Sequence, residues 1–403
     1  MHLTLACVLI LISAFLYSRE LSTAAAQPVE SEIEGQAAAL AANHWLDLEG
    51  RRLPVFVRLE RGGFVPLIPV YATALLANVQ PAGSTPVRWA AVVFGVIDVL
   101  LFYALVVRCC RRAAIGFTAA LVLLVTPSHA FFSTTATVDG VWQLPFVLCW
   151  AVGLSALSTP PTLRARCLLA VGTASLAISA YSQPSAALMM PMFGIISIFM
   201  FHRSKEWRLV DATIASAAFA AAMLPLALWY ARYPTTYPDT FGRWVLHPAH
   251  LRNPVDWWGA VANWGRISTV ANLFSDFFSP SHLFVTPGAP ALAGMFLLPT
   301  VVPIAAGLHR LLRPGGHERD VVQVLSPAIV GACIVGPLAA AMFGQARSDE
   351  RALVIVPFGL VLAVAGCLRF WWGGRTVGRV MLVTLLLVAA IQAMFYFSNN
   401  HSV

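Results

Sequence analysis

Charged residues are scarce in this chain of 403 residues: Asp, Glu, Lys and Arg together make up 11% of it, and Lys205 is the only lysine. A soluble domain carries about 25% charged residues, because its surface must be hydrated. Hydrophobic residues make up 59% of the sequence, and the mean hydropathy is +0.75. The composition therefore excludes an ordinary soluble protein and indicates an integral membrane protein.

Several other signals are missing as well. The seven cysteines show neither metal-ligand spacing nor a disulfide framework. No block of clustered basic residues accompanies the net charge of +8, which argues against a nucleic-acid-binding protein. The sequence contains no internal repeat, low-complexity stretch or separate soluble domain. We therefore expect a single transmembrane domain that covers residues 1–403.

Apolar runs recur along the whole sequence. A helix that crosses a bilayer needs about 20 apolar residues, with a range of about 17 to 25. Several of the runs are shorter than that. We predict an all-α bundle of about eleven transmembrane helices, at Leu3–Tyr17, Val87–Val107, Ala113–Val125, Val141–Leu157, Cys167–Ala180, Ala186–Phe201, Val210–Tyr230, Ala291–Leu308, Val321–Phe343, Ala352–Leu368 and Val380–Phe397.

Basic residues between these runs predict the orientation. They lie in five short loops on one side of the predicted bundle, at residues 108–112, 164–166, 203–208, 310–319 and 369–379. The positive-inside rule makes that side cytoplasmic. With the first span retained, the N-terminus is cytoplasmic and the C-terminus external. The alternative is cleavage of the first span after its Ala-Ala-Ala sequence, which resembles a signal-peptidase site.

Two long hydrophilic segments fall on the external side, at residues 18–86 and 231–290. The first opens on acidic residues and includes an Ala-rich stretch that predicts a helix, followed by a Pro-interrupted region. The second predicts short helices and turns, and its many aromatic residues suit a membrane interface. Most of the candidate catalytic and binding residues lie in or beside these two external segments.

Glu30, Glu32 and Glu34 form the densest acidic cluster, just after the first span. Carboxylates at this spacing repel one another unless something organises them. At a helix N-terminus, Glu30 and Glu34 share one face, and the helix dipole favours their charge. The cluster is either a solvated helix start or the site of a general base, with its pKa tuned by its neighbours or by a metal.

Two aspartates are further candidates. Asp139 follows a polar stretch on the external side, where it either caps the next helix or meets the acidic cluster in one cavity. Asp98 lies in the middle of the second span, where a carboxylate costs about 2.5 to 3.5 kcal/mol and must face protein or water. It makes either an interhelical hydrogen bond or the proton relay of a transporter.

External arginines and histidines complete the set of candidates. Arg347 and Arg351 open the tenth span, where they either anchor the helix at the interface or bind a phosphate group. His247 lacks convincing metal-ligand spacing. His129 and His282 are isolated in the sequence, and each is expected to be a loop histidine on the external side with its hydrogen bonds satisfied.

Four stretches, in this order and topology, resemble a known family. They are Ser31–Gln36 with the turn at Leu53–Phe56, Pro66–Tyr71 with Val87–Trp89, Phe278–Phe284, and the arginine-led start of a late span at Arg351–Phe358. The pattern resembles the C-type glycosyltransferase superfamily. Within that superfamily, the likeness is to bacterial relatives of protein O-mannosyltransferases and lipid A aminoarabinose transferases.

The resemblance implies an inverting enzyme that moves a sugar from a polyprenyl-phosphate donor to a lipid, glycan or protein acceptor. The site would lie on the periplasmic side of a bacterial inner membrane. A carboxylate of the acidic cluster, Glu32 or Glu34 and by spacing also Glu30, would be the general base. Arg347, Arg351 or a divalent metal held partly by Asp139 would stabilise the leaving phosphate.

The sequence also departs from the family pattern. The adjacent Asp-Glu pair is replaced by Glu32-Ile33-Glu34, and Arg61 is the only cation near the position where a lysine is common. His247 and Trp257 would line the sugar or the acceptor, although an interfacial aromatic belt explains Trp257 equally well. Two other classes of function stay open: a transporter or lipid flippase, and a non-catalytic assembly subunit.

Overall fold

The computed structural model describes residues 2–21, 28–58, 64–77, 85–135, 137, 140–183, 185–204, 206–233, 264–284, 294–312, 321–342, 349–372 and 376–399. This part of the chain is built almost entirely from helices, as the sequence predicts. Two short antiparallel strands, β1 (Phe56–Arg58) and β2 (Phe64–Pro66), add a small sheet. The sequence does not predict them, because strands of three residues carry too little alternation to be recognised.

The helices of the first half of the chain end at Arg232. They are α1 (His2–Glu20), α2 (Pro28–Ala42), α3 (Leu67–Ala77), α4 (Pro86–Cys110), α5 (Ala113–Leu124), α6 (Pro127–Thr134), η1 (Val141–Gln143), α7 (Leu144–Leu154), η2 (Ser155–Ser158), α8 (Leu163–Ser179), α9 (Ala186–Arg203) and α10 (Leu209–Arg232).

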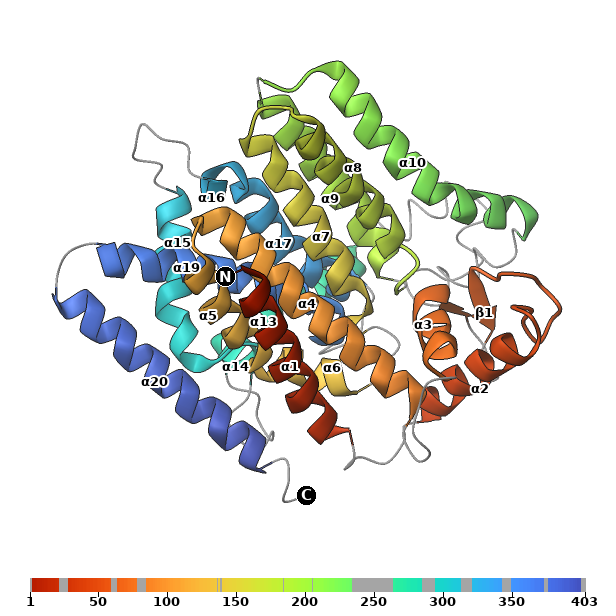
Figure 1. Cartoon of the computed structure of the whole chain (residues 1–403), viewed down its shortest axis with the longest axis horizontal. Helices are drawn as coiled ribbons and strands as arrows, with labels where there is room; N and C mark the ends of the chain where they lie inside the picture. The colour runs from red at the N-terminus through yellow and green to blue at the C-terminus, as the bar shows by residue number, and fades with distance from the viewer. Residues whose placement is uncertain are drawn as a thin grey trace.

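The described helices of the second half begin at Trp264, inside the predicted second hydrophilic segment. They are α13 (Trp264–Phe277), α14 (Pro280–Phe284), η4 (Leu298–Thr300), α15 (Val301–Leu312), α16 (Val321–Val324), α17 (Ser326–Met342), α18 (Asp349–Ala352), α19 (Ile355–Trp372) and α20 (Thr376–Asn399). Figure 1 shows most helices of the two halves gathered in one bundle, with α10 and α20 at its edges.

Five helices in the described part are long and apolar enough to cross a membrane: α1, α4, α9, α10 and the continuous stretch Val141–Ser158. α5 and α6 make a sixth span if they are counted together, although they are bent by 66°. The bend falls at Thr126, because the following proline disfavours helical geometry in the residue before it. The other apolar stretches that can be tested within the described residues are 10–17 residues long, so the total of eleven spans stays a prediction.

Close helix packing depends on glycine at two places. α7 and α8 meet at Gly153 and Gly172, where a Cβ atom added to Gly153 would lie 2.7 Å from the Cα atom of Gly172. α15 and α19 meet at Gly307, where an added Cβ atom would collide with the backbone of Leu362. Small residues let membrane helices approach this closely, and the resulting van der Waals packing holds the bundle together.

The first hydrophilic segment packs against the end of α4 that begins at Pro86. Figure 1 shows α2, α3 and β1 together at this end of the bundle. Ile33, Ala37 and Leu40 share one face of α2 and are buried against α3, β1 and α4. This face holds the acidic start of α2 beside the first turn of α4. The predicted external side and the predicted loop limits, 18–86 and 231–290, stay predictions.

Candidate functional site

A buried ion pair holds the start of α2 against the start of α4. The Nη2 atom of Arg88 lies 2.8 Å from Oε2 of Glu30, and its Nε atom lies 3.2 Å from both carboxylate oxygens. The two side chains are 5% and 1% exposed. Arg88 also donates a hydrogen bond to the backbone oxygen of Leu21, just after α1. Arg88 thus joins three segments, and Glu30 is bound as its partner.

Glu34 lies one helical turn beyond Glu30 and is half-buried. Its Oε1 atom accepts a hydrogen bond of 3.4 Å from the backbone N–H of Val87. Burial raises the pKa of the Glu34 carboxyl above its usual range. The Val87 N–H opposes that rise, the negative charge of Glu30 adds to it, and the Arg88 guanidinium opposes it again. A half-buried carboxylate with a raised pKa is a stronger base than an unshifted one, which suits general-base catalysis.

Glu32 lies on a different side of α2. Two residues along an α-helix are about 200° apart, so Glu32 points away from the face that Glu30 and Glu34 share. Its side chain is half-buried, and its Oε2 atom is shielded from solvent. Of the three predicted bases, Glu34 combines access, a raised pKa and a position beside the buried ion pair.

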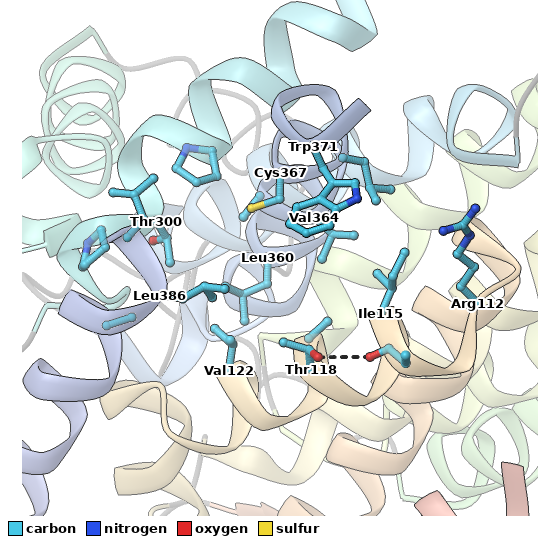
Figure 2. Close-up of a pocket in the computed structure, with 18 residues that line it drawn as sticks. Arg112, Ile115, Thr118, Val122, Thr300, Leu360, Val364, Cys367, Trp371 and Leu386 are labelled. Atoms are coloured by element: carbon cyan, nitrogen blue, oxygen red, sulfur yellow. Dashed lines mark hydrogen bonds between the residues drawn. The ribbon is translucent and has the colours of Figure 1, made fainter. Parts of the chain in front are cut away.

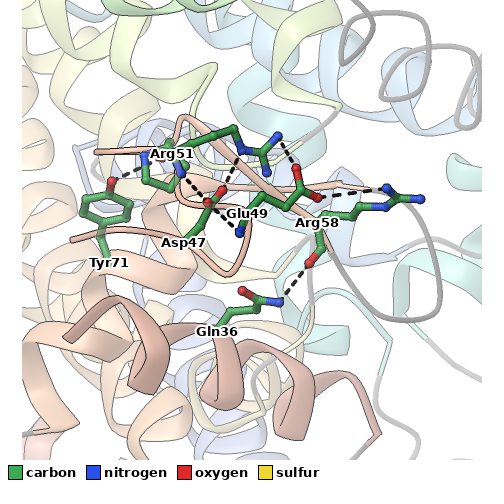
Figure 3. Close-up of polar contacts among 7 residues, drawn as sticks. Gln36, Asp47, Glu49, Arg51, Arg58 and Tyr71 are labelled. Atoms are coloured by element: carbon green, nitrogen blue, oxygen red, sulfur yellow. Dashed lines mark hydrogen bonds and ion pairs between the residues drawn. The ribbon is translucent and has the colours of Figure 1, made fainter. Parts of the chain in front are cut away.

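A polar network holds the rest of this segment in place (Figure 3). Asp47 accepts hydrogen bonds from two backbone N–H groups and pairs with the Arg51 side chain, whose Nε atom is 2.7 Å from Oδ2. Gln36 of α2 donates to the backbone oxygen of Arg58 in β1 at 2.9 Å. The Arg51 guanidinium lies 5.4 Å from the ring centroid of Trp229 in α10. The network therefore fixes α2 to the sheet and the segment to the bundle.

A second polar group joins the two later stretches that resemble the glycosyltransferase family. Nε2 of His282 in α14 lies 3.1 Å from Oδ1 of Asp349 in α18. The His282 ring packs edge-on against Phe277, with 5.0 Å between the ring centroids. Arg351, on the same short helix as Asp349, is only 1% exposed. The contact agrees with the prediction that His282 has a polar partner, but His282 lies in a short helix and not in a loop.

A third group lies inside the bundle. Oδ2 of Asp98 in α4 is 3.6 Å from Nε2 of His129 in α6, and Nδ1 of His129 is 2.9 Å from the Tyr17 hydroxyl of α1. All three residues are fully buried. The hydrogen bond with Tyr17 agrees with the prediction of a partnered histidine at position 129, but the prediction of a loop position is wrong, because His129 is buried in α6. Asp98 faces His129 across a helix interface, but neither of its carboxylate oxygens has a hydrogen-bond partner among the described residues, so the predicted interhelical hydrogen bond is not formed.

Five predicted site residues lie outside the described residues: Arg61, Asp139, His247, Trp257 and Arg347. Their roles stay predictions. Within the described ranges, no three His, Cys, Asp or Glu side chains gather closely enough to hold a metal ion. The described carboxylates therefore do not form a ligand set, and the predicted metal site depends on Asp139.

The sequence alone predicts no role for Arg88. An arginine in the first turn of an apolar helix is costly unless something compensates its charge, and an acidic cluster precedes that helix in the sequence. Together, these two facts are the signal in the sequence from which an ion pair of Arg88 could have been predicted. They indicate that one carboxylate of the cluster neutralises Arg88, but not which of the three does so.

The described helix bundle is similar in fold to solved C-type glycosyltransferases, as the sequence resemblance predicts. The structure is similar to ArnT from Cupriavidus metallidurans bound to undecaprenyl phosphate. The TM-score is 0.60, and the sequences are 12% identical over 98% of this chain and 75% of that chain.

The structure is also similar to the oligosaccharyltransferase of Archaeoglobus fulgidus in complex with Zn and sulfate, with a TM-score of 0.58 and 12% identity. That alignment covers 97% of this chain and 53% of the archaeal protein, so the chain spans about half of its length. No family model matches the sequence, and no curated protein matches it in sequence. At these identities, the structural likeness establishes the fold.

Proposed function

We propose that the protein is a membrane glycosyltransferase that moves a sugar from a polyprenyl-phosphate donor to a hydroxyl group of a lipid, glycan or protein. The observation that carries the proposal is the accessible Glu34, whose raised pKa suits a base. The Glu30–Arg88 pair holds the helix turn before it. The likeness to ArnT, which was solved with undecaprenyl phosphate, supports the choice of a lipid-phosphate donor.

In the proposed reaction, Glu34 accepts the proton of the acceptor hydroxyl while the hydroxyl oxygen attacks the anomeric carbon of the sugar. The bond between that carbon and the phosphate oxygen breaks, and its electron pair leaves with the polyprenyl phosphate. A single displacement of this kind inverts the anomeric centre. Glu30 and Arg88 act as positioning residues, because their charges neutralise each other and hold α2 against α4.

The leaving phosphate needs positive charge where its own charge develops. We assign this role to Arg351, which lies in α18 beside the His282–Asp349 contact, together with Arg347. A divalent metal held by Asp139 would supply the same stabilisation as a Lewis acid. The sequence proposes three further residues around the donor and the acceptor, namely Arg61, His247 and Trp257.

We place this site on the external face of the membrane, which is the periplasmic face in a bacterial inner membrane. Glu30 and Glu34 contact the first turn of α4, at Val87 and Arg88. Arg111 and Arg112 follow the other end of the same helix. Because the positive-inside rule assigns the arginine-rich end to the cytoplasm, the acidic end faces outward.

The test uses the purified full chain in liposomes, with a radiolabelled polyprenyl-phosphate sugar and a membrane extract as the acceptor source. We expect Glu34→Gln to reduce transfer by about 100-fold or more, because it removes the base. The matched control is Glu49→Gln, in an exposed carboxylate of the same segment, which should retain wild-type transfer. Full transfer by Glu34→Gln would overturn the assignment of the base. Absence of turnover with every polyprenyl donor would overturn the proposed function.

The transporter alternative depends on Asp98, the one predicted carboxylate at depth. Transport sites at the bilayer midplane face a cavity that opens to each side in turn. Asp98 is instead fully buried beside His129 and makes contact across the helix interface. This environment favours a structural role for Asp98 and supports transfer over transport.

A further inference from the structure

A large apolar cleft lies away from the acidic segment, between α5, α15, α19 and α20 (Figure 2). Its volume is about 500 Å³, which is within the range of about 300 to 1,000 Å³ typical of ligand sites. Its walls are formed mainly by aliphatic side chains, including Ile115, Val122, Pro303, Leu360, Val364 and Leu386. The cleft is therefore large enough for a hydrocarbon chain and has the surface to bind one.

The two hydroxyl groups in the wall, those of Thr118 and Thr300, are already hydrogen-bonded. Thr118 donates its hydroxyl to the backbone oxygen of Ala114 at 3.0 Å, as Figure 2 shows. Thr300 donates its hydroxyl to the backbone oxygen of Leu297 at 2.7 Å. Because each hydroxyl bonds within its own helical turn, the wall presents few donors to an occupant. The middle of the cleft therefore suits an apolar chain rather than a sugar.

The cleft is open toward the outside of the bundle. Leu386 and Trp371 both line it and are 41% and 45% exposed. α20 lies at the edge of the bundle (Figure 1). At the far end of the cleft, the Gln392 side chain of α20 accepts a hydrogen bond of 2.9 Å from the backbone N–H of Leu298. In a membrane, lipid chains reach this opening directly.

The opposite end of the cleft is positively charged. Arg112, at the start of α5, is the only charged residue among the described residues that line the cleft. The guanidinium of Arg379, near the start of α20, lies 5.6 Å from the ring centroid of Trp371, which also lines the cleft. Both arginines fall within the predicted basic segments 108–112 and 369–379, which the positive-inside rule places on the cytoplasmic side. Basic pockets between helices on that side bind anionic lipid head groups.

We propose that the cleft binds one acyl chain of an anionic phospholipid from the cytoplasmic leaflet, with the lipid phosphate between Arg112 and Arg379. Arg112 follows one end of α4, whereas Glu30 and Glu34 contact its other end. A helix of 25 residues is about 37 Å long. The lipid site is therefore separate from the proposed transfer site, and neither proposal depends on the other.

The first test measures lipid retention by native mass spectrometry. The purified full chain is titrated with phosphatidylglycerol, and separately with phosphatidylcholine of the same acyl chains. We expect preferential retention of phosphatidylglycerol, and a loss of about fivefold in its affinity for each of Arg112→Gln and Arg379→Gln. The control is Arg164→Gln, which removes an exposed arginine at the start of α8, away from the cleft, and should leave retention unchanged.

The second test fills the cleft. Val364→Trp places a large ring inside it, and Leu387→Trp places the same ring on α20 at an exposed position outside it. We expect only Val364→Trp to lower phosphatidylglycerol retention. Equal retention of the two phospholipids, or an equal effect of the two tryptophan variants, would overturn the proposal. A preference for undecaprenyl phosphate over phosphatidylglycerol would also overturn it, since the cleft would then be a donor site.

Discussion

The imidazole of His282 and the carboxylate of Asp349 meet at 3.1 Å and thereby join α14 to α18. Each residue lies in or beside a stretch that resembles the glycosyltransferase family, and the contact brings the two stretches together. Arg351 lies only two residues beyond Asp349 and is buried. The His282–Asp349 contact therefore orients the helix that carries the arginine we assign to the leaving phosphate.

We predict that Asp349→Ala raises KM for the polyprenyl donor about tenfold and changes kcat less. The reason is positional: without the contact, α18 and its arginine shift, and a misplaced cation binds the phosphate less well. The pair is 11% and 31% exposed, so the loss of stability should stay below about 1 kcal/mol. Steady-state kinetics with a defined donor and a thermal unfolding curve in detergent measure the two effects.

The control for this prediction is Asp276→Asn, which changes an exposed aspartate of α13. It should leave both KM and kcat at wild-type values. Asp349→Glu, which keeps the charge and can still reach His282, should restore most of the affinity for the donor. A fall in kcat with unchanged KM in Asp349→Ala would contradict a positioning role.

The sequence predicts the helical fold, the family resemblance and the acidic start of α2, because these depend on composition and local periodicity. It does not predict the contacts of Glu30 with Arg88, of Asp98 with His129 or of His282 with Asp349. Each of these pairs joins residues that are far apart in the chain, and nothing local specifies the partner. The same limit explains why the sequence left three candidates for the general base. The Glu30–Arg88 contact removes Glu30 from these candidates, because its carboxylate is bound to Arg88.

The pH dependence of transfer should reflect Glu34. A base must be deprotonated to work, and burial raises the pKa of Glu34 above its usual value of about 4.3. We expect kcat/KM to be constant well above this raised pKa and to fall tenfold per pH unit once the pH drops below it. Glu34→Gln should lose this acidic limb, and its residual activity should be flat over the same range.

Glu34 should also affect stability in the opposite direction to activity. Its pKa is higher in the folded protein than in the unfolded chain, so the folded state favours the neutral form. The stability linked to this group is present below the unfolded pKa and is lost as the pH rises through the folded pKa. At pH 7, Glu34→Gln should therefore raise Tm slightly while transfer falls. A lower Tm would attribute the loss of transfer to misfolding.

The Glu30–Arg88 pair should behave as a buried ion pair. Removing one partner leaves a buried charge without compensation, so Arg88→Met is expected to destabilise the protein by about 3 to 5 kcal/mol. Replacing both residues, in Glu30→Gln with Arg88→Met, removes both charges and should recover most of that loss. Thermal unfolding of the wild type, of each single variant and of the double variant gives the coupling energy between Glu30 and Arg88. Additive losses in the double variant would contradict direct pairing.

Asp98 and His129 provide the test that separates transfer from transport. Both side chains are fully buried and lie 3.6 Å apart. Substitution of either one leaves the other buried without its polar neighbour, which should destabilise the protein. We expect Asp98→Asn and His129→Gln each to lower Tm, and the double variant to lower it by less than the sum of the two. Once folded, all three variants should keep the sugar-transfer rate of the wild type. If Asp98 instead relayed protons, Asp98→Asn would abolish proton-coupled uptake into liposomes at unchanged Tm, and that result would favour the transporter.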